Sequence, residues 1–64
     1  MSPKKTLLQR EKELQALLAT PAGRQALHEL AARYQATTGR LRPAGTSPVT
    51  FIIVHERANG LIES

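Results

Sequence analysis

The sequence predicts an all-α fold of three short helices. Three dipeptides, Ser2-Pro3, Thr20-Pro21 and Ser47-Pro48, each place a hydroxyl residue directly before a proline. Such a pair is typical of a helix start, because the hydroxyl caps the helix and proline at the first position loses no helical hydrogen bond. Apolar residues then recur at helical spacing. We therefore expect a helix-turn-helix-like arrangement with helices over about residues 3–19, 21–38 and 48–58.

The first expected helix carries its apolar residues on one broad stripe. The stripe consists of the leucines Leu7, Leu14, Leu17 and Leu18. Charged residues of the same helix are expected outside the stripe, namely Arg10, Lys12 and Glu13. The helix should end before Pro21, because a proline disfavours the α conformation of the residue that precedes it.

The second expected helix has the clearest periodicity. Its buried face follows the i, i+3, i+4, i+7 spacing with Leu27, Leu30, Ala31 and Tyr34. Gly39 fits a left-handed C-cap. Because so few residues separate it from the first helix, the two should form an antiparallel hairpin or a sharp corner. Residues 39–47, which include Pro43, are expected to form a loop.

The third segment, 48–58, has two interpretations. Six consecutive β-branched or aromatic residues, 49–54, favour a buried strand. The Ser47-Pro48 start and the Asn59-Gly60-Leu61 sequence, which fits a Schellman-type helix end, favour a helix. We expect a helix, because tertiary burial routinely overrides intrinsic propensity. Such a helix is apolar nearly all round and needs cover on more than one side.

A chain of 64 residues allows a single small domain, 1–64, with a marginal core. There is no cysteine to form a disulfide or a thiolate zinc site, and two histidines cannot complete a structural zinc centre. We therefore expect self-association to complete the fold, with a homodimer favoured. No metal and no cofactor is expected.

Several function classes are not expected from this sequence. It has no apolar run near the roughly 20 residues of a membrane span, and no secretory signal is expected, so we expect a cytoplasmic protein without a membrane partner. The four glycines are isolated, which excludes a nucleotide-binding loop, and no serine has the context of a nucleophile. His28-Glu29 and His55-Glu56 lack a second histidine at i+4. We expect neither an enzyme nor a small-molecule substrate.

The surplus of four positive charges is unevenly distributed. Residues 1–10 and 21–42 each carry a net charge of +3, whereas 11–20 and 43–64 each carry −1. Clustered basic residues are typical of a protein that binds a polyanion, although they are equally typical of a soluble, solvated surface. Because only Tyr34 and Phe51 are aromatic, stacking on single-stranded bases is not expected, and the polyanion would be duplex DNA or structured RNA.

Residues 46–63 contain a capping sequence, Thr46-Ser47-x-x-Thr50, then apolar Ile53 and Val54, then Gly60-Leu61-Ile62-Glu63. This stretch resembles the recognition helix and the start of the wing in winged-helix repressors of the MarR and LexA type. In those families the helix enters the major groove of DNA. The resemblance implies that Ser47 and Thr50 touch phosphates or base edges, that Arg57 lies farther along the helix, and that Arg40 and Arg42 contact the backbone beside it.

Two functions follow as hypotheses. The first is a small basic DNA-binding protein that contacts duplex mainly through its backbone. Its expected nucleic-acid contacts are Lys4, Lys5, Arg33, Arg40, Arg42, Ser47, Thr50 and Arg57. The second is a non-enzymatic structural or adaptor subunit that buries its apolar C-terminal segment in a homo-oligomer or a larger complex. Its expected interface is Phe51, Ile52, Ile53, Val54 and Leu61.

Overall fold

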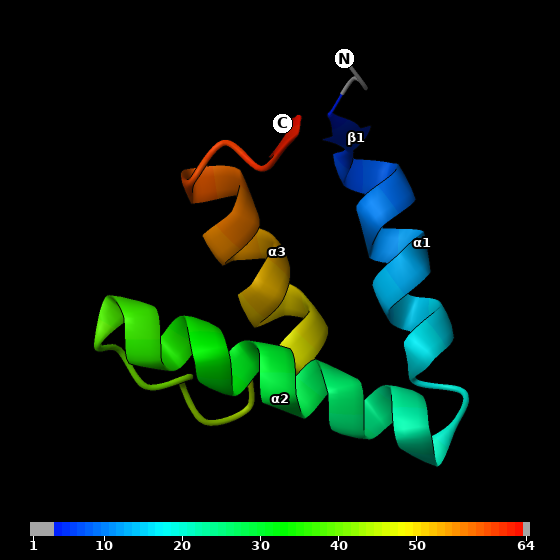
Figure 1. Cartoon of the computed structure of the whole chain (residues 1–64), viewed down its shortest axis with the longest axis horizontal. Helices are drawn as coiled ribbons and strands as arrows, with labels where there is room; N and C mark the ends of the chain where they lie inside the picture. The colour runs from blue at the N-terminus through cyan, green and yellow to red at the C-terminus, as the bar shows by residue number, and fades with distance from the viewer. Residues whose placement is uncertain (1–3, 64) are drawn as a thin grey trace.

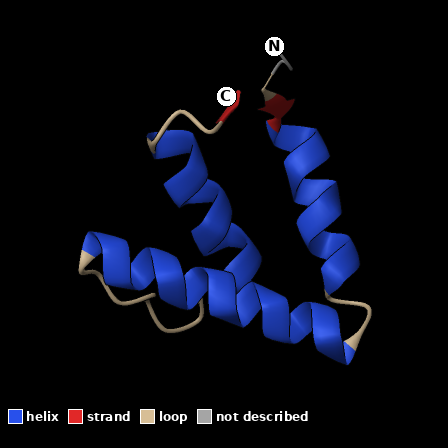
Figure 2. Ribbon diagram, in the orientation of Figure 1, coloured by secondary structure: helices blue, strands red, loops and turns tan. Residues whose placement is uncertain are grey.

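The computed structural model describes residues 4–63 as three helices and a small two-stranded sheet (Figure 1, Figure 2). Along the chain the elements are β1 (Lys5–Thr6), α1 (Leu7–Leu17), α2 (Pro21–Thr38), α3 (Pro48–Ala58) and β2 (Ile62–Glu63). The predicted three-helix fold is confirmed, and the segment over 48–58 is a helix rather than a strand.

Helix α1 begins later than the sequence predicted. The expected start at Ser2-Pro3 lies outside the described residues, and the helix opens at Leu7 behind a capping box. The hydroxyl of Thr6 accepts from the Gln9 N–H at 3.2 Å, and the Gln9 side chain accepts from the Thr6 N–H at 3.1 Å. The N–H groups of Thr6 and Gln9, at the N-terminal end of α1, are thereby both hydrogen-bonded, and Thr6 is the N-cap of the helix.

Helices α1 and α2 meet at a tight corner. Thr20 caps α2 by accepting from the Gly23 N–H at 3.0 Å. A Cβ added at Gly23 would overlap the carbonyl oxygen of Leu17, so only glycine allows the two helices to approach this closely. At the other end of α2, Gly39 has a φ of 71° and donates to the Gln35 carbonyl, as the predicted left-handed cap requires.

Helix α3 is held at both ends by local hydrogen bonds. The Ser47 hydroxyl accepts from the Thr50 N–H at 3.2 Å. At the other end, the N–H of Leu61 donates to the Glu56 carbonyl and the N–H of Gly60 donates to the Arg57 carbonyl. These two bonds form a Schellman motif. The local signals therefore produce a helix even though its residues favour a strand.

The two ends of the described chain pair as parallel strands, which the sequence did not predict. Lys5 lies opposite Ile62, and Thr6 lies opposite Glu63. Figure 1 shows α2 running across one end of α1 and α3, while β1 and β2 meet at the opposite end. Ile62 of β2 is buried, and β2 contacts both α1 and α3.

One hydrophobic core lies where the three helices meet. Its buried residues are Leu14, Leu27, Ala31, Val49 and Ile52. The stripe predicted for α2 is confirmed, since Leu30 and Tyr34 pack against this core. The stripe predicted for α1 is only partly correct, because Leu14 is buried whereas Leu17 and Leu18 are exposed. Within residues 4–63, no helix has the length and hydropathy needed to cross a membrane.

Candidate nucleic-acid interface

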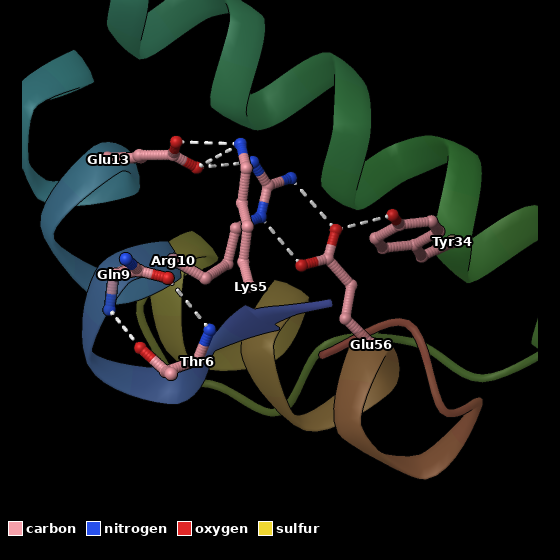
Figure 3. A network of polar contacts seen from close by, with 7 residues as sticks. All are labelled: Lys5, Thr6, Gln9, Arg10, Glu13, Tyr34 and Glu56. Atoms are coloured by element: carbon pink, nitrogen blue, oxygen red, sulfur yellow. Dashed lines mark hydrogen bonds and ion pairs between the residues drawn. The ribbon is translucent and has the colours of Figure 1, made fainter. Parts of the chain in front are cut away.

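A buried carboxylate lies at the junction of the three helices. Glu56 of α3 is only 4% exposed. Its carboxylate accepts from Arg10 Nε at 2.7 Å and Nη2 at 2.9 Å, and from the Tyr34 hydroxyl at 2.8 Å (Figure 3). Arg10 comes from α1 and Tyr34 from α2. One carboxylate therefore joins all three helices.

The surroundings of Glu56 favour its charged form. Burial acts to raise the pKa of Glu56, but the hydrogen bonds from Arg10 and Tyr34 outweigh it and hold that pKa below the ordinary value. Conversely, burial first and then the neighbouring Glu56 carboxylate raise the pKa of Tyr34 to about 12. The Tyr34 ring also stacks on His55, with ring centroids 4.0 Å apart and planes at 17°.

A second, exposed group of ion pairs lies on the N-terminal part of the chain. Lys5 Nζ donates to both Glu13 oxygens at 2.7 and 2.9 Å, and Arg10 Nη1 reaches Glu13 at 3.4 Å (Figure 3). The hydrogen bond from Lys5 is the main reason that the pKa of Glu13 lies below its ordinary value. Lys5, an expected nucleic-acid contact, is thus engaged within the chain, while Lys4 beside it is exposed.

The buried ion pair changes the charge balance of the surface around α3. Between residues 30 and 60, Glu56 is the sole acidic residue of the sequence. It is buried and already paired with Arg10 from another part of the chain. The same stretch carries four arginines, none of which forms an ion pair among residues 4–63. We call these the arginine group: Arg33, Arg40, Arg42 and Arg57.

The arginine group comes from three consecutive elements. Arg33 lies in the C-terminal half of α2, Arg40 and Arg42 in the loop that follows, and Arg57 in the last turn of α3. Arg33 is near enough to Tyr34 to act on it electrostatically, and Arg40 lies against α3 in a shared groove. All but Arg42, which is half-buried, are exposed.

The two hydroxyls expected to touch nucleic acid bond to one another. Ser47 Oγ donates to Thr50 Oγ1 at 3.1 Å while it caps α3. Both side chains are exposed at the first turn of the helix. Thr50 and Arg57 lie seven residues apart and so share the outward face of α3, with Val54 between them.

An open groove of about 380 Å³ lies between the end of α2 and α3. Phe51, Val54 and Ala58 supply its apolar surface. Arg40 and His55 are among its polar residues, together with Thr38 and Asn59.

The residues expected to form a protein interface separate into two groups. Ile52 is 0% exposed and belongs to the chain's own core, because it shares the inward face of α3 with Val49. Its assignment to an interface is therefore wrong for this fold. Phe51 and Ile53 are half-buried, whereas Val54 and Leu61 remain 62% and 55% exposed.

The junction of Arg10, Tyr34 and Glu56 was not predicted, because Arg10 was expected outside the apolar stripe of the first helix and Tyr34 was expected to serve only as a core residue. The spacing of Arg10 and Glu56 from the apolar residues of their own helices could have indicated the junction. Arg10 lies three residues after Leu7 and four before Leu14, and Glu56 lies four residues after Ile52. Each charged residue thus continues a buried face. His28 is exposed, and residues 4–63 contain no cluster of three or more candidate metal ligands.

Comparison with protein-family models, with curated proteins and with solved structures found no match to this chain.

Proposed function

We propose that the protein binds duplex DNA through its phosphate backbone, using the arginine group. One observation carries this proposal: the sole carboxylate between residues 30 and 60 is buried and neutralised by Arg10, so this stretch of the chain presents four arginines and no exposed carboxylate of its own. A guanidinium presents several N–H donors in a planar fork that matches a phosphate. Four such groups that form no ion pair among residues 4–63 favour a ligand that carries regularly spaced negative charge.

The outward face of α3 supports backbone contact more than base reading. Thr50 and Arg57 are its polar residues, with Val54 between them, and this set lacks the asparagine or glutamine that reads adenine. Phosphate contacts position a protein on the duplex without selecting a sequence. We therefore propose modest sequence preference.

The resemblance to winged-helix repressors is consistent with this proposal at two points. Helix α3 starts behind the Ser47 cap, and the strand Ile62–Glu63 follows it, as the start of a wing would. Two features differ from that family. The loop over 39–47 is longer than the 3–4-residue turn of a helix-turn-helix, and β2 pairs in parallel with β1.

A comparison of two double variants tests the proposal. Arg40→Ala/Arg42→Ala removes two charges from the arginine group, and Lys12→Ala/Arg24→Ala removes two from other parts of the chain. Titration of a labelled duplex, followed by fluorescence anisotropy at low salt, should show about tenfold or greater weakening in the first variant only. No duplex binding by the wild-type chain, or equal weakening in both variants, would refute the proposal.

A structural or adaptor role is the second candidate, and the exposed apolar side chain of Val54 favours it. A contiguous exposed apolar patch marks a contact surface, and Val54 lines one groove together with Phe51 and Ala58. We propose that a partner covers Phe51, Ile53 and Val54 of α3, with Leu61 at its C-terminal end. Light scattering coupled to gel filtration separates a homo-oligomer from a monomer that awaits a different partner.

A further inference from the structure

The groove beside α3 has the shape of a helix-binding site. Its apolar residues Phe51, Val54 and Ala58 recur at i, i+3 and i+7, so they form one stripe along α3. The stripe covers about 10 Å of helix axis at 1.5 Å per residue. An amphipathic partner helix binds such a groove with apolar residues at i, i+3, i+4 and i+7.

The charge around the groove selects among partners. Arg40 lies in the groove, and none of its lining residues is acidic. The nearest acidic residue in sequence, Glu56, is buried and paired with Arg10. A second copy of this chain would bring a net charge of +4 and the same cationic groove to this surface. Like charges brought together across an interface oppose binding, so the groove is poorly suited to self-association.

We propose that the groove binds an acidic amphipathic helix of another protein. Apolar side chains of that helix would cover Phe51 and Val54, and its flanking carboxylates would pair with Arg40. This inference deepens the adaptor role and does not depend on duplex binding. It replaces a second copy of the chain with a partner of opposite charge.

The experiment is a selection of displayed peptides of about 16 residues, long enough to form a helix when bound. Peptides are selected on the wild-type chain only, and Val54→Lys, which keeps the cationic surface and blocks the apolar stripe, is kept for the titration that follows. The enriched peptides should be acid-rich, with apolar residues at i, i+3 or i+4, and i+7. An enriched set without acidic residues or without this spacing, or no enrichment, would overturn the proposal.

A selected peptide is then titrated against matched variants by fluorescence anisotropy. Val54→Lys should weaken its binding about tenfold or more, although the added charge would strengthen a purely electrostatic contact. Leu8→Lys places the same charge on an exposed residue of α1 and should not weaken binding. Arg40→Glu should also weaken peptide binding, and it leaves the apolar residues of the groove unchanged. Equal affinity of the wild-type chain and both groove variants would overturn the proposal.

Parallel measurements separate this inference from the wider functions. Circular dichroism of each variant confirms that the three helices are retained. A homo-oligomer in light scattering together with no selected acidic peptide would leave the adaptor role standing and contradict this inference. Peptide binding lost in Val54→Lys while duplex affinity is retained would assign the apolar stripe to the protein partner. Duplex binding with no peptide binding would assign the surface to nucleic acid and contradict the inference.

Discussion

The Glu56 carboxylate accepts two N–H bonds from the Arg10 guanidinium, at 2.7 and 2.9 Å, and so joins α3 to α1 across 46 positions of sequence. The pair lies beside a core of few residues, with a third bond from the Tyr34 hydroxyl. It therefore has two roles. It fixes how the helices meet, and it removes the only negative charge between residues 30 and 60 from the surface.

The first prediction concerns the stability that depends on Glu56. Glu56→Ala leaves Arg10 and the Tyr34 hydroxyl without their acceptor, and we expect it to lower the free energy of unfolding by about 3 kcal/mol. That is a large part of the roughly 3–10 kcal/mol expected for a domain of this size. Urea denaturation followed by circular dichroism measures the loss. Glu29→Ala, on the exposed surface of α2, is the control, and an equal small loss in both variants would contradict the account.

The second prediction concerns acid. The folded-state pKa of Glu56 lies below its ordinary value, so its contribution is fully present above the unfolded pKa of about 4.3. That contribution is lost as the pH falls from about 4.3 through the lower folded pKa. We expect the free energy of unfolding, measured in urea, to change little between about pH 7 and pH 5 and to fall below about pH 4. In Glu56→Gln the free energy of unfolding should fall less below about pH 4. An unchanged fall in that variant would assign the effect to other carboxylates.

The third prediction uses Tyr34, the single tyrosine of the chain. Because its pKa is raised to about 12, tyrosinate absorbance should rise with a midpoint near that value while the protein remains folded. An unfolded tyrosine titrates near a pKa of about 10. The contribution of Tyr34 to the free energy of unfolding is therefore fully present below about pH 10 and is lost as the pH rises through the folded pKa. Glu56→Gln should lower the midpoint. A midpoint near 10 in protein that circular dichroism shows to be folded would argue against the Tyr34–Glu56 hydrogen bond.

The fourth prediction concerns the corner between α1 and α2. Gly23→Ala forces a Cβ against the Leu17 carbonyl oxygen. We expect the free energy of unfolding to fall by about 2–4 kcal/mol, because the corner must open to make room. Gly39→Ala is the matched control, because nothing lies within 4 Å of its added Cβ and only the positive φ is strained. That variant should lose about 1 kcal/mol. Equal losses in urea denaturation would show that the corner tolerates a side chain.

The sequence predicted the helices because their ends depend on local chemistry. Thr20-Pro21 and Ser47-Pro48 cap the helices that follow them, and Gly39 and Gly60 adopt the positive φ that ends them. Such signals act within a few residues and do not depend on the rest of the fold. They were sufficient even for 48–58, where composition favoured a strand.

Features that depend on distant partners were not predicted. Helix α1 starts at Leu7 behind Thr6, which both caps the helix and belongs to the strand that pairs with β2. No local pattern couples two-residue segments at opposite ends of the chain. Arg10 was expected outside the apolar stripe, and Glu56 was given no partner, since burial of either charge alone would be unfavourable and only their pairing makes it acceptable.

The salt dependence of duplex affinity tests the central proposal most directly. Contacts from four arginines to phosphates predict a slope of about −3.6 in a plot of log affinity against log salt concentration. The slope should become less negative by about 1.8 in Arg40→Ala/Arg42→Ala, and it should stay unchanged in Lys12→Ala/Arg24→Ala. Affinity that does not depend on salt, or the same slope in both double variants, would contradict a DNA-binding role for the arginine group.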